Sequence, residues 1–347
     1  MDIVFERRHH LGIITLARPQ ALNALTLAMI QAMQAQLLQW QDDSTVHAVI
    51  IQAEPGKAFC AGGDVRRIYD AGQAKDPQQL QFFWHEYRLN LCIHHYNKPY
   101  IALMDGITMG GGVGISLHGS HPVATQNFVF AMPETGIGLF PDIGASYHLV
   151  RCPGASGNYL GLTGNRLNNQ DALALGLVRH CIDSESLAEV VTGLVALDLT
   201  SDAHKRVSEF LNQFSQPAQQ APILNAMDNI NHYFSESNAR TIAEKLAASK
   251  DEWAINISRT IQQKSPLSMA VTCEQLQRAK KLSLAECLIM DYRLVNHFMA
   301  GHDFYEGIRA LLVDKDKSPR WQPKRLEDIS ETMIKCYFDA VPVELSF

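Results

Sequence analysis

Hydrophobic and polar positions in the first half of the chain repeat an order of strand, glycine loop and helix. Short alternating runs predict strands near Ile3–Arg8 and Gly12–Ala17, and apolar residues at helical spacing predict a helix over Asn23–Asp43. The mostly apolar runs Val46–Ala53 and Tyr100–Met104 are typical of strands that are buried on both faces, as in parallel sheets. This pattern predicts an α/β fold with repeated crossovers.

The same order continues between and beyond these runs. Helices are expected across Asp64–Asn97 and from the triple glycine Gly110–Gly112 to about His118. A further strand is expected near Asn127–Met132. The spacing is too irregular for a short solenoid repeat.

Strand signals nearly vanish after the polar segment Gln213–Pro222, whose two prolines make it the best candidate for a linker. Ser265 followed by Pro266 is a typical helix start, and Ser283 with Glu286 has the spacing of a capping box. The sequence therefore predicts a core over residues 1–212 and a mainly helical C-terminal region over residues 223–347.

Composition and net charge argue against several classes of protein. Of 347 residues, 30 are Lys or Arg and 36 are Asp or Glu, so the net charge of −6 argues against nucleic acid or a membrane surface as the main partner. Seven scattered cysteines, with no Cys-x-x-Cys pair and no histidines at metal-ligand spacing, disfavour disulfides and bound metal. The first eight residues resemble no signal or transit peptide. We expect a cytoplasmic protein without a membrane span.

Glycines occupy two strand-to-helix turns, Ala61–Asp64 and Gly110–Gly112. Backbone N–H groups at two adjacent turns of this kind can donate to one oxygen, which is the arrangement of an oxyanion hole. The alternative is that the glycines only allow tight turns or close packing, and each loop alone favours that alternative.

Two carboxylates, Glu134 and Asp142, lie in an otherwise apolar segment rich in proline and glycine, Met132–Gly144. Apolar surroundings raise the pKa of a carboxyl group, which suits acid–base catalysis. A helix-capping Glu and a turn Asp would explain the same pattern, and the local sequence does not separate the two interpretations.

Several motifs in this order resemble the crotonase (enoyl-CoA hydratase/isomerase) superfamily. The general motifs are Ala17–Leu25, Lys57–Asp64, Gly106–Gly114, Met132–Thr135 and Leu162–Gly164. Three more resemble a thioester-hydrolysing branch of that superfamily: Gly138–Asp142, Gly301–Gly307 and Asp314–Trp321. The resemblance extends from about residue 10 to residue 321. It implies a ββα spiral core with a helical C-terminal region.

The resemblance also implies roles for individual residues. The backbone N–H groups of Gly63 and Gly111 would form the oxyanion hole, and Glu134 would be the catalytic glutamate. Asp142 would orient a 3-hydroxyl group and assist proton transfer, and Glu86 would contribute to substrate binding. Whether Glu134 acts as nucleophile or as general base stays open.

One departure from the hydratase pattern favours hydrolysis. Hydratases carry a second glutamate three residues beyond the middle glycine of the triple, where this chain has Gly114. The resemblance therefore implies hydrolysis of 3-hydroxyisobutyryl-CoA to 3-hydroxyisobutyrate and coenzyme A, as in valine degradation. The alternatives are hydration or isomerisation of an enoyl-CoA, and a catalytically silent acyl-CoA-binding protein. The sequence does not separate this substrate from 3-hydroxypropionyl-CoA, which lacks one methyl group.

Coenzyme A carries phosphate groups, so binding it requires local positive charge. Lys57, Arg66 and Arg67 flank the first glycine turn, which also contains Ala61. Lys57, Ala61 and Arg66 are therefore candidate coenzyme A contacts, with ordinary solvated surface charge as the alternative. No cofactor is expected, because coenzyme A is part of the substrate and product. The superfamily often forms trimers, so a homo-oligomer is possible.

Overall fold

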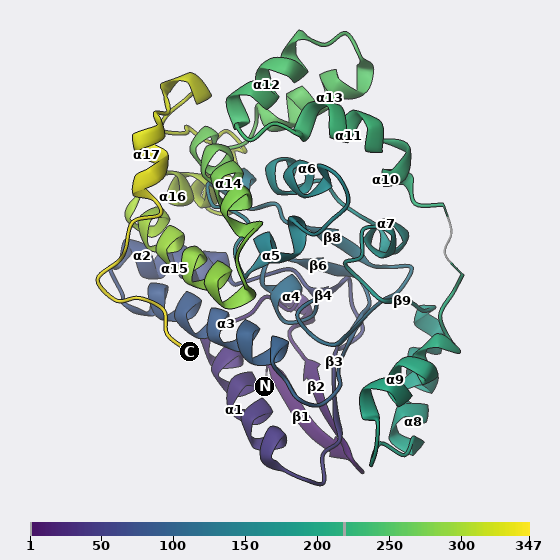
Figure 1. Cartoon of the computed structure of the whole chain (residues 1–347). Coiled ribbons are helices and arrows are strands. Elements are labelled where there is room, and N and C mark those ends of the chain that lie inside the picture. Colours follow the sequence, from purple (N-terminus) through teal and green to yellow (C-terminus); the bar gives the residue numbers. More distant parts are fainter. Residues whose placement is uncertain (1, 218–219) are drawn as a thin grey trace. The chain divides into compact units, whose positions relative to one another are not determined.

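The computed structural model describes residues 2–217 and 220–347. Figure 1 shows its helices and strands in sequence colours. The chain divides into two compact units that alternate along the sequence. Unit 1 comprises Met1–Asp64, Arg88–Phe130 and Leu167–Leu224, and unit 2 comprises Val65–Tyr87, Ala131–Arg166 and Asn225–Phe347. Met1, Ala218 and Gln219 lie outside the described residues, and the last two belong to the predicted linker. The predicted boundary between residues 212 and 223 stays a prediction.

Two sheets organise unit 1. The larger has the strand order β1 (Ile3–Arg8), β2 (Leu11–Leu16), β3 (Ala48–Ala53), β5 (Tyr100–Met104), β7 (His121–Ala124) and β9 (His180–Cys181). All of its pairings are parallel except that of β1 with β2. The smaller sheet has the order β4 (Ala58–Cys60), β6 (Ile107–Met109) and β8 (Val129–Ala131). Each pair β3–β4, β5–β6 and β7–β8 places its first strand in the larger sheet and its second in the smaller one. This repeat is the predicted ββα spiral.

Alternating side chains of the larger sheet form the core of unit 1. One face packs against helices α8 (Leu187–Ala196) and α9 (Ala203–Asn212), which lie beside the sheet in Figure 1. The buried residues of this cluster include Leu11, Ile13, Ile50, Leu103, Val190, Leu194, Val207 and Leu211. On the opposite face, a Cβ atom at Gly12 would lie 2.6 Å from the ring of Trp40. Glycine is therefore required where α1 (Leu27–Asp42) packs against the sheet.

Helix α1 begins four residues later than the predicted start at Asn23. Leu22 and Asn23 adopt left-handed backbone conformations, with φ values of 52° and 54°. The Asn23 side chain donates to the Ala58 carbonyl at 2.9 Å and accepts from the Arg18 N–H at 2.8 Å. Thr26 then caps the helix by accepting from the Met29 N–H. These hydrogen bonds keep Asn23 out of the helix that the apolar periodicity predicts. Strands β4, β6, β7 and β9 (His180–Cys181) were not predicted, because each has only two to four residues.

Unit 2 is mainly helical. Its longer helices are α2 (Val65–Gln73), α6 (Ser156–Thr163), α11 (Met227–Phe234), α12 (Ala239–Ala248), α13 (Glu252–Ile261), α14 (Pro266–Ala279) and α15 (Leu284–Ala300). Shorter helices are α5 (Ala145–Leu149), α16 (Asp303–Ile308) and α17 (Glu331–Cys336). The division between the units falls inside α3 (Gln78–His94). The remaining short helices are α4 (Gly111–Gly114) and α7 (Asn169–Ala174) in unit 1, and α10 (Pro222–Asn225) where the units divide.

Both predicted helix starts in the C-terminal region are confirmed. Ser265 caps α14 by accepting from the Ser268 N–H at 3.0 Å, and Pro266 occupies the first helical position. Ser283 and Glu286 form a reciprocal capping box at the start of α15. Helix α14 is buried on nearly all sides, which explains why it carries few charged residues. Across residues 2–217 and 220–347, no helix combines the length and apolar character that a membrane span needs.

Candidate active site

The three predicted carboxylates all belong to unit 2 and are all buried. Glu134 begins a short 3-10 helix (Glu134–Ile137) directly after Pro133, and Asp142 follows Pro141 in the loop before α5. Glu86 lies in the part of α3 that belongs to unit 2. Their relative exposures are 5%, 5% and 2%. Burial to this extent is unusual for carboxylates and needs either partners or protonation.

The pKa values show that these groups interact. Burial raises the pKa of Glu86 well above its usual value, and the charges of Asp142 and Glu134 raise it further. Burial also raises the pKa of Glu134, with a further contribution from Asp142. The pKa of Asp142 rises to about 6, again because of burial. Burial and mutual repulsion therefore disfavour simultaneous ionisation of the three groups.

Tyr87 is a site residue that the sequence analysis missed. Its hydroxyl donates to Asp142 Oδ2 at 2.8 Å, and this hydrogen bond lowers the pKa of Asp142. Burial raises the pKa of Tyr87 itself well above 10.0, so it stays a phenol that can donate. In contrast, Glu134 Oε2 and Glu86 Oε1 are buried and have no hydrogen-bond partner among the described residues. Each of these two oxygens therefore keeps its capacity to accept a hydrogen bond from a reactant.

Two further buried side chains hold the loop that carries Asp142. Gln275 of α14 donates through Nε2 to the Pro141 carbonyl at 2.9 Å and to Asp291 Oδ1 at 2.8 Å. Asp291 of α15 accepts the Gly144 N–H through Oδ2 at 2.8 Å. The loop Pro141–Gly144 is therefore fixed at both ends. Burial raises the pKa of Asp291, and the nearby charge of Asp142 adds to that rise.

Lys264 supplies positive charge to the same region of unit 2. Its charge lowers the pKa of Glu134, while burial lowers the pKa of Lys264 itself. The Lys264 ammonium lies beside the 3-10 helix Glu134–Ile137, because a Cβ atom at Gly136 would be 3.3 Å from Lys264 Nζ. Gly136 and Lys264 also line a cavity of about 350 Å³ that Lys317 and Trp321 help to enclose.

Both glycine turns belong to unit 1, where they lie side by side because β4 and β6 are parallel neighbours. A Cβ atom at Gly62 would lie 3.7 Å from the Gly111 nitrogen, and one at Gly112 would lie 2.1 Å from the Cys60 carbonyl oxygen. Glycine is therefore required at position 112 by the close approach to Cys60, and at position 62 by its φ of 118°. Within the described part of the chain, the N–H groups of Gly63 and Gly111 take part in no hydrogen bond. Both donors are available to a ligand.

Gly114, the position that departs from the hydratase pattern, ends helix α4 in unit 1. A Cβ atom there would lie 2.7 Å from Asn90 Nδ2. A glutamate at this position would collide with Asn90 unless that side chain moved.

The candidate coenzyme A contacts are dispersed. Lys57 and Ala61 flank β4 in unit 1, and Lys57 is exposed. Arg66 lies in α2 of unit 2, where it pairs with Asp70 at 3.0 Å on the exposed surface. This ion pair offsets part of its charge. The role of these three residues in binding coenzyme A stays a prediction.

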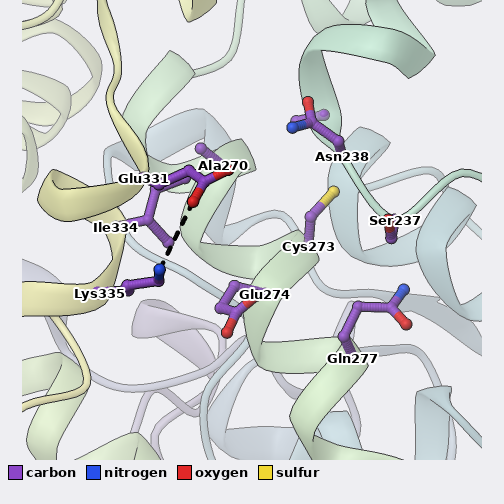
Figure 2. A pocket seen from close by; sticks show the side chains of 10 residues that line it. Ser237, Asn238, Ala270, Cys273, Glu274, Gln277, Glu331, Ile334 and Lys335 are labelled. Carbon is purple, nitrogen blue, oxygen red and sulfur yellow. Dashed lines mark ion pairs between the residues drawn. The ribbon is translucent and has the colours of Figure 1, made fainter.

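Figure 2 shows a different cavity of unit 2, of about 320 Å³, between α12, α14 and α17. Its lining includes Cys273, Glu274 and Gln277 and the ion pair of Glu331 with Lys335 at 3.5 Å. It contains none of the predicted site residues, so it is not the candidate active site. Among residues 2–217 and 220–347, no cluster of three or more His, Cys, Asp or Glu side chains has the arrangement of a metal site.

The missed residues Tyr87, Lys264, Gln275 and Asp291 share one feature. Each acts on a carboxylate or its loop from a distant part of the sequence, so no local motif marks it. Tyr87 follows Glu86 directly, and this adjacency was the only available signal.

Comparisons with known proteins identify the family of this chain. Residues 11–338 match the family model described as enoyl-CoA hydratase/isomerase. The mitochondrial 3-hydroxyisobutyryl-CoA hydrolase of Xenopus tropicalis is 45% identical over 335 residues, covering 95% of this chain and 86% of that protein. The human enzyme of the same name is 42% identical, covering 98% of this chain and 89% of that protein.

Solved structures confirm the fold. A carnitinyl-CoA dehydratase from Mycobacterium thermoresistibile superposes with a TM-score of 0.93 at 35% identity, covering 100% of this chain and 98% of that one. An enoyl-CoA hydratase from Rhodobacter sphaeroides superposes with a TM-score of 0.91 at 34% identity, and both chains are fully covered.

The comparisons also correct one prediction. The expected cytoplasmic location is contradicted, because the curated relatives are named as mitochondrial enzymes. That expectation depended on the absence of a recognisable targeting segment, and such an absence does not determine where a protein resides. The family assignment, in contrast, depends on motifs that extend along nearly the whole chain. The protein belongs to the enoyl-CoA hydratase/isomerase family and, within it, to the group of the 3-hydroxyisobutyryl-CoA hydrolases.

Proposed function

We propose that this protein hydrolyses the thioester of 3-hydroxyisobutyryl-CoA to 3-hydroxyisobutyrate and free coenzyme A, as a step of valine degradation. The names of relatives at 41–45% identity support this substrate. The proposed reaction needs water and no cofactor beyond the coenzyme A of the substrate. Formation of a homo-oligomer stays a prediction, which light scattering of the purified protein tests.

The observation that carries the proposal is the pair of buried carboxyl groups, Glu134 and Asp142, in unit 2. The charge of Asp142 raises the pKa of Glu134, so the two groups interact electrostatically within unit 2. Tyr87 holds Asp142 from α3, while Glu134 keeps an unpartnered oxygen. One carboxyl group is thus fixed and the other is available to react.

In the proposed reaction, the Gly63 and Gly111 N–H groups donate to the thioester oxygen. Each such donor typically contributes ~3–4 kcal/mol to the stabilisation of the developing oxyanion. Glu134 either attacks the carbonyl carbon or takes a proton from a water molecule that attacks it. In the first route the C–S bond breaks to leave an anhydride, which water then hydrolyses. Both routes consume one water and release a carboxylate and a thiol, and Asp142 assists the proton transfers.

A thiol-release assay tests this function. The panel consists of 3-hydroxyisobutyryl-CoA, 3-hydroxypropionyl-CoA, isobutyryl-CoA and crotonyl-CoA. We expect thiol release from the two hydroxyacyl substrates and no hydration of crotonyl-CoA. Hydration of crotonyl-CoA without any thiol release would refute the proposal.

A single turnover of the wild-type protein in ¹⁸O-labelled water separates the two routes. Attack by Glu134 leaves the label in the Glu134 carboxyl group after the anhydride is hydrolysed at that carbon, or in the product after hydrolysis at the acyl carbon. General-base catalysis places the label only in the product. Mass spectrometry of the peptide that contains Glu134 therefore identifies the nucleophilic route when labelled peptide is found.

The second candidate function is hydration of an enoyl-CoA, because the two superposed structures are named as a dehydratase and a hydratase. Gly114 opposes it, since the side chain of Asn90 occupies the space that a second glutamate would need. A silent acyl-CoA-binding protein is opposed by the buried, unpartnered oxygen of Glu134, which binding alone would not require.

A further inference from the structure

Asn90 carries an unexplained polar group in unit 1. Its side chain is fully buried in α3, and neither Nδ2 nor Oδ1 has a hydrogen-bond partner among the described residues. An amide buried without partners destabilises the folded state, because it loses its hydrogen bonds to water. Such a group in a native protein needs an explanation, and a polar ligand that pairs with it is one.

The amide of Asn90 lies against helix α4. The position that a Cβ atom would take at Gly114 is 2.7 Å from Asn90 Nδ2 and 3.2 Å from Oδ1. Glycine at this position leaves room for the amide. Any larger residue would displace it.

Gly111, whose free N–H is the proposed oxyanion donor, begins the same short helix. Residues three apart on a helix are neighbours, with side-chain positions about 5–6 Å apart. An acyl group whose carbonyl oxygen accepts from Gly111 carries its 3-hydroxyl group two carbon atoms beyond the carbonyl carbon. The Asn90 amide thus contacts the same helical turn that carries the Gly111 donor.

We propose that Asn90 recognises the 3-hydroxyl group of the acyl chain and makes the enzyme specific for 3-hydroxyacyl thioesters. A hydroxyl group both donates and accepts hydrogen bonds, as does an amide, so the substrate satisfies the buried group that the free protein leaves unpartnered. This inference rests on the proposed hydrolysis of a hydroxyacyl-CoA. It assigns to Asn90 the selection between hydroxylated and plain acyl groups, in addition to the orienting role that the family resemblance implies for Asp142.

A buried polar group discriminates strongly against an analogue that cannot pair with it, whereas an added methyl group changes binding only modestly. The proposal therefore predicts that isobutyryl-CoA is a poor substrate. Asn90 does not separate 3-hydroxyisobutyryl-CoA from 3-hydroxypropionyl-CoA, because both carry the hydroxyl group.

The test is the ratio of kcat/KM for 3-hydroxyisobutyryl-CoA to kcat/KM for isobutyryl-CoA, measured in wild type and in Asn90→Leu. Leucine has a similar size and no polar atoms. We expect the ratio to fall by about tenfold or more. The change should come from the hydroxylated substrate, while turnover of isobutyryl-CoA is maintained or improved. The Tm should stay the same or rise, because the substitution removes an unpartnered amide.

Gly114→Ala is the second variant, since its methyl group must push the Asn90 amide aside, and it should lower the same ratio. Leu91→Met, a buried apolar change at the next position of α3, is the matched control and should leave the ratio unchanged. An unchanged ratio in Asn90→Leu would overturn the proposal. So would an equal loss on both substrates together with a lower Tm, which indicates a structural role. If the wild type itself releases no thiol from 3-hydroxyisobutyryl-CoA, the proposed function fails and this inference fails with it.

Discussion

At the scale of single residues, Glu86, Glu134 and Asp142 differ from surface carboxyl groups in their surroundings. Burial and mutual repulsion raise their pKa values, and Tyr87 partly offsets the rise at Asp142. The sequence indicated Glu134 and Asp142 because they stand in an apolar segment. It did not indicate Tyr87 or Lys264, because their effects depend on which side chains the fold brings together.

Glu134→Gln should abolish turnover, because an amide can neither attack the thioester nor accept a proton. We expect kcat to fall by at least about 10³-fold, with coenzyme A binding retained. Thiol release measures the first quantity and titration calorimetry the second. The exposed residue Glu185 provides the matched control, since Glu185→Gln should leave both unchanged. Unchanged turnover in Glu134→Gln would show that the catalytic assignment is wrong.

Tyr87→Phe should move the acidic limb of the pH–rate profile to higher pH. The hydrogen bond from Tyr87 lowers the pKa of Asp142, so its removal raises that pKa above the present value of about 6. More of Asp142 is then protonated at a given pH, and activity that needs the carboxylate is lost at a higher pH. Tyr100→Phe is the control, because the Tyr100 hydroxyl donates instead to the Ile115 carbonyl. A shift toward lower pH in Tyr87→Phe would contradict this account.

At the scale of elements, helices α14 and α15 position the loop that carries Asp142. Their starts could be predicted, because a capping serine followed by proline and a capping box are local signals. The start of α1 could not, because Asn23 is taken out of the helix by hydrogen bonds to Ala58 and Arg18. Local sequence therefore predicts a helix end best where the capping hydrogen bonds are made by residues next to that end in the sequence.

Gln275→Met should loosen the loop, since methionine keeps the volume and removes both donated hydrogen bonds. Two buried acceptors, the Pro141 carbonyl and Asp291 Oδ1, then lose a partner. We expect stability to fall by about 1–3 kcal/mol and kcat to fall by about 10–100-fold through misplacement of Asp142. Chemical denaturation and thiol release measure the two effects.

The matched control for this variant is Thr272→Val on the same helix, whose hydroxyl group is buried and makes no hydrogen bond among the described residues. It should keep both stability and kcat. If Gln275→Met loses stability but keeps full kcat, the two helices hold the fold without positioning Asp142.

At the scale of the whole molecule, the buried carboxyl groups make stability depend on pH. A raised pKa means that the folded state keeps a proton that the unfolded state releases, so the free energy of unfolding falls as pH rises through that interval. For Asp142 the interval runs from 3.8 to about 6, and the raised pKa values of Glu86 and Glu134 act in the same direction. The Asp142 shift alone corresponds to about 3 kcal/mol.

The Tm should accordingly be higher at about pH 5.5 than at about pH 8. Glu86→Gln removes one of the buried acids and should reduce this difference while raising the Tm at the higher pH. Scanning calorimetry of the wild type and of Glu86→Gln at the two pH values measures this difference in Tm. A wild-type Tm that rises with pH would contradict the assignment of raised pKa values.

The sequence by itself determined the succession of strands, glycine turns and helices, the family and the candidate residues Glu134, Asp142, Gly63 and Gly111. Periodicity, turn glycines and helix caps are local, so they can be read without the fold. Only the tertiary structure decided that Tyr87 donates to Asp142, that Gln275 and Asp291 fix its loop, and that Asn90 faces Gly114. These contacts join residues that lie far apart in the sequence or that belong to different helices and strands. Their hydrogen bonds and pKa shifts arise from burial and packing, which a local pattern does not specify.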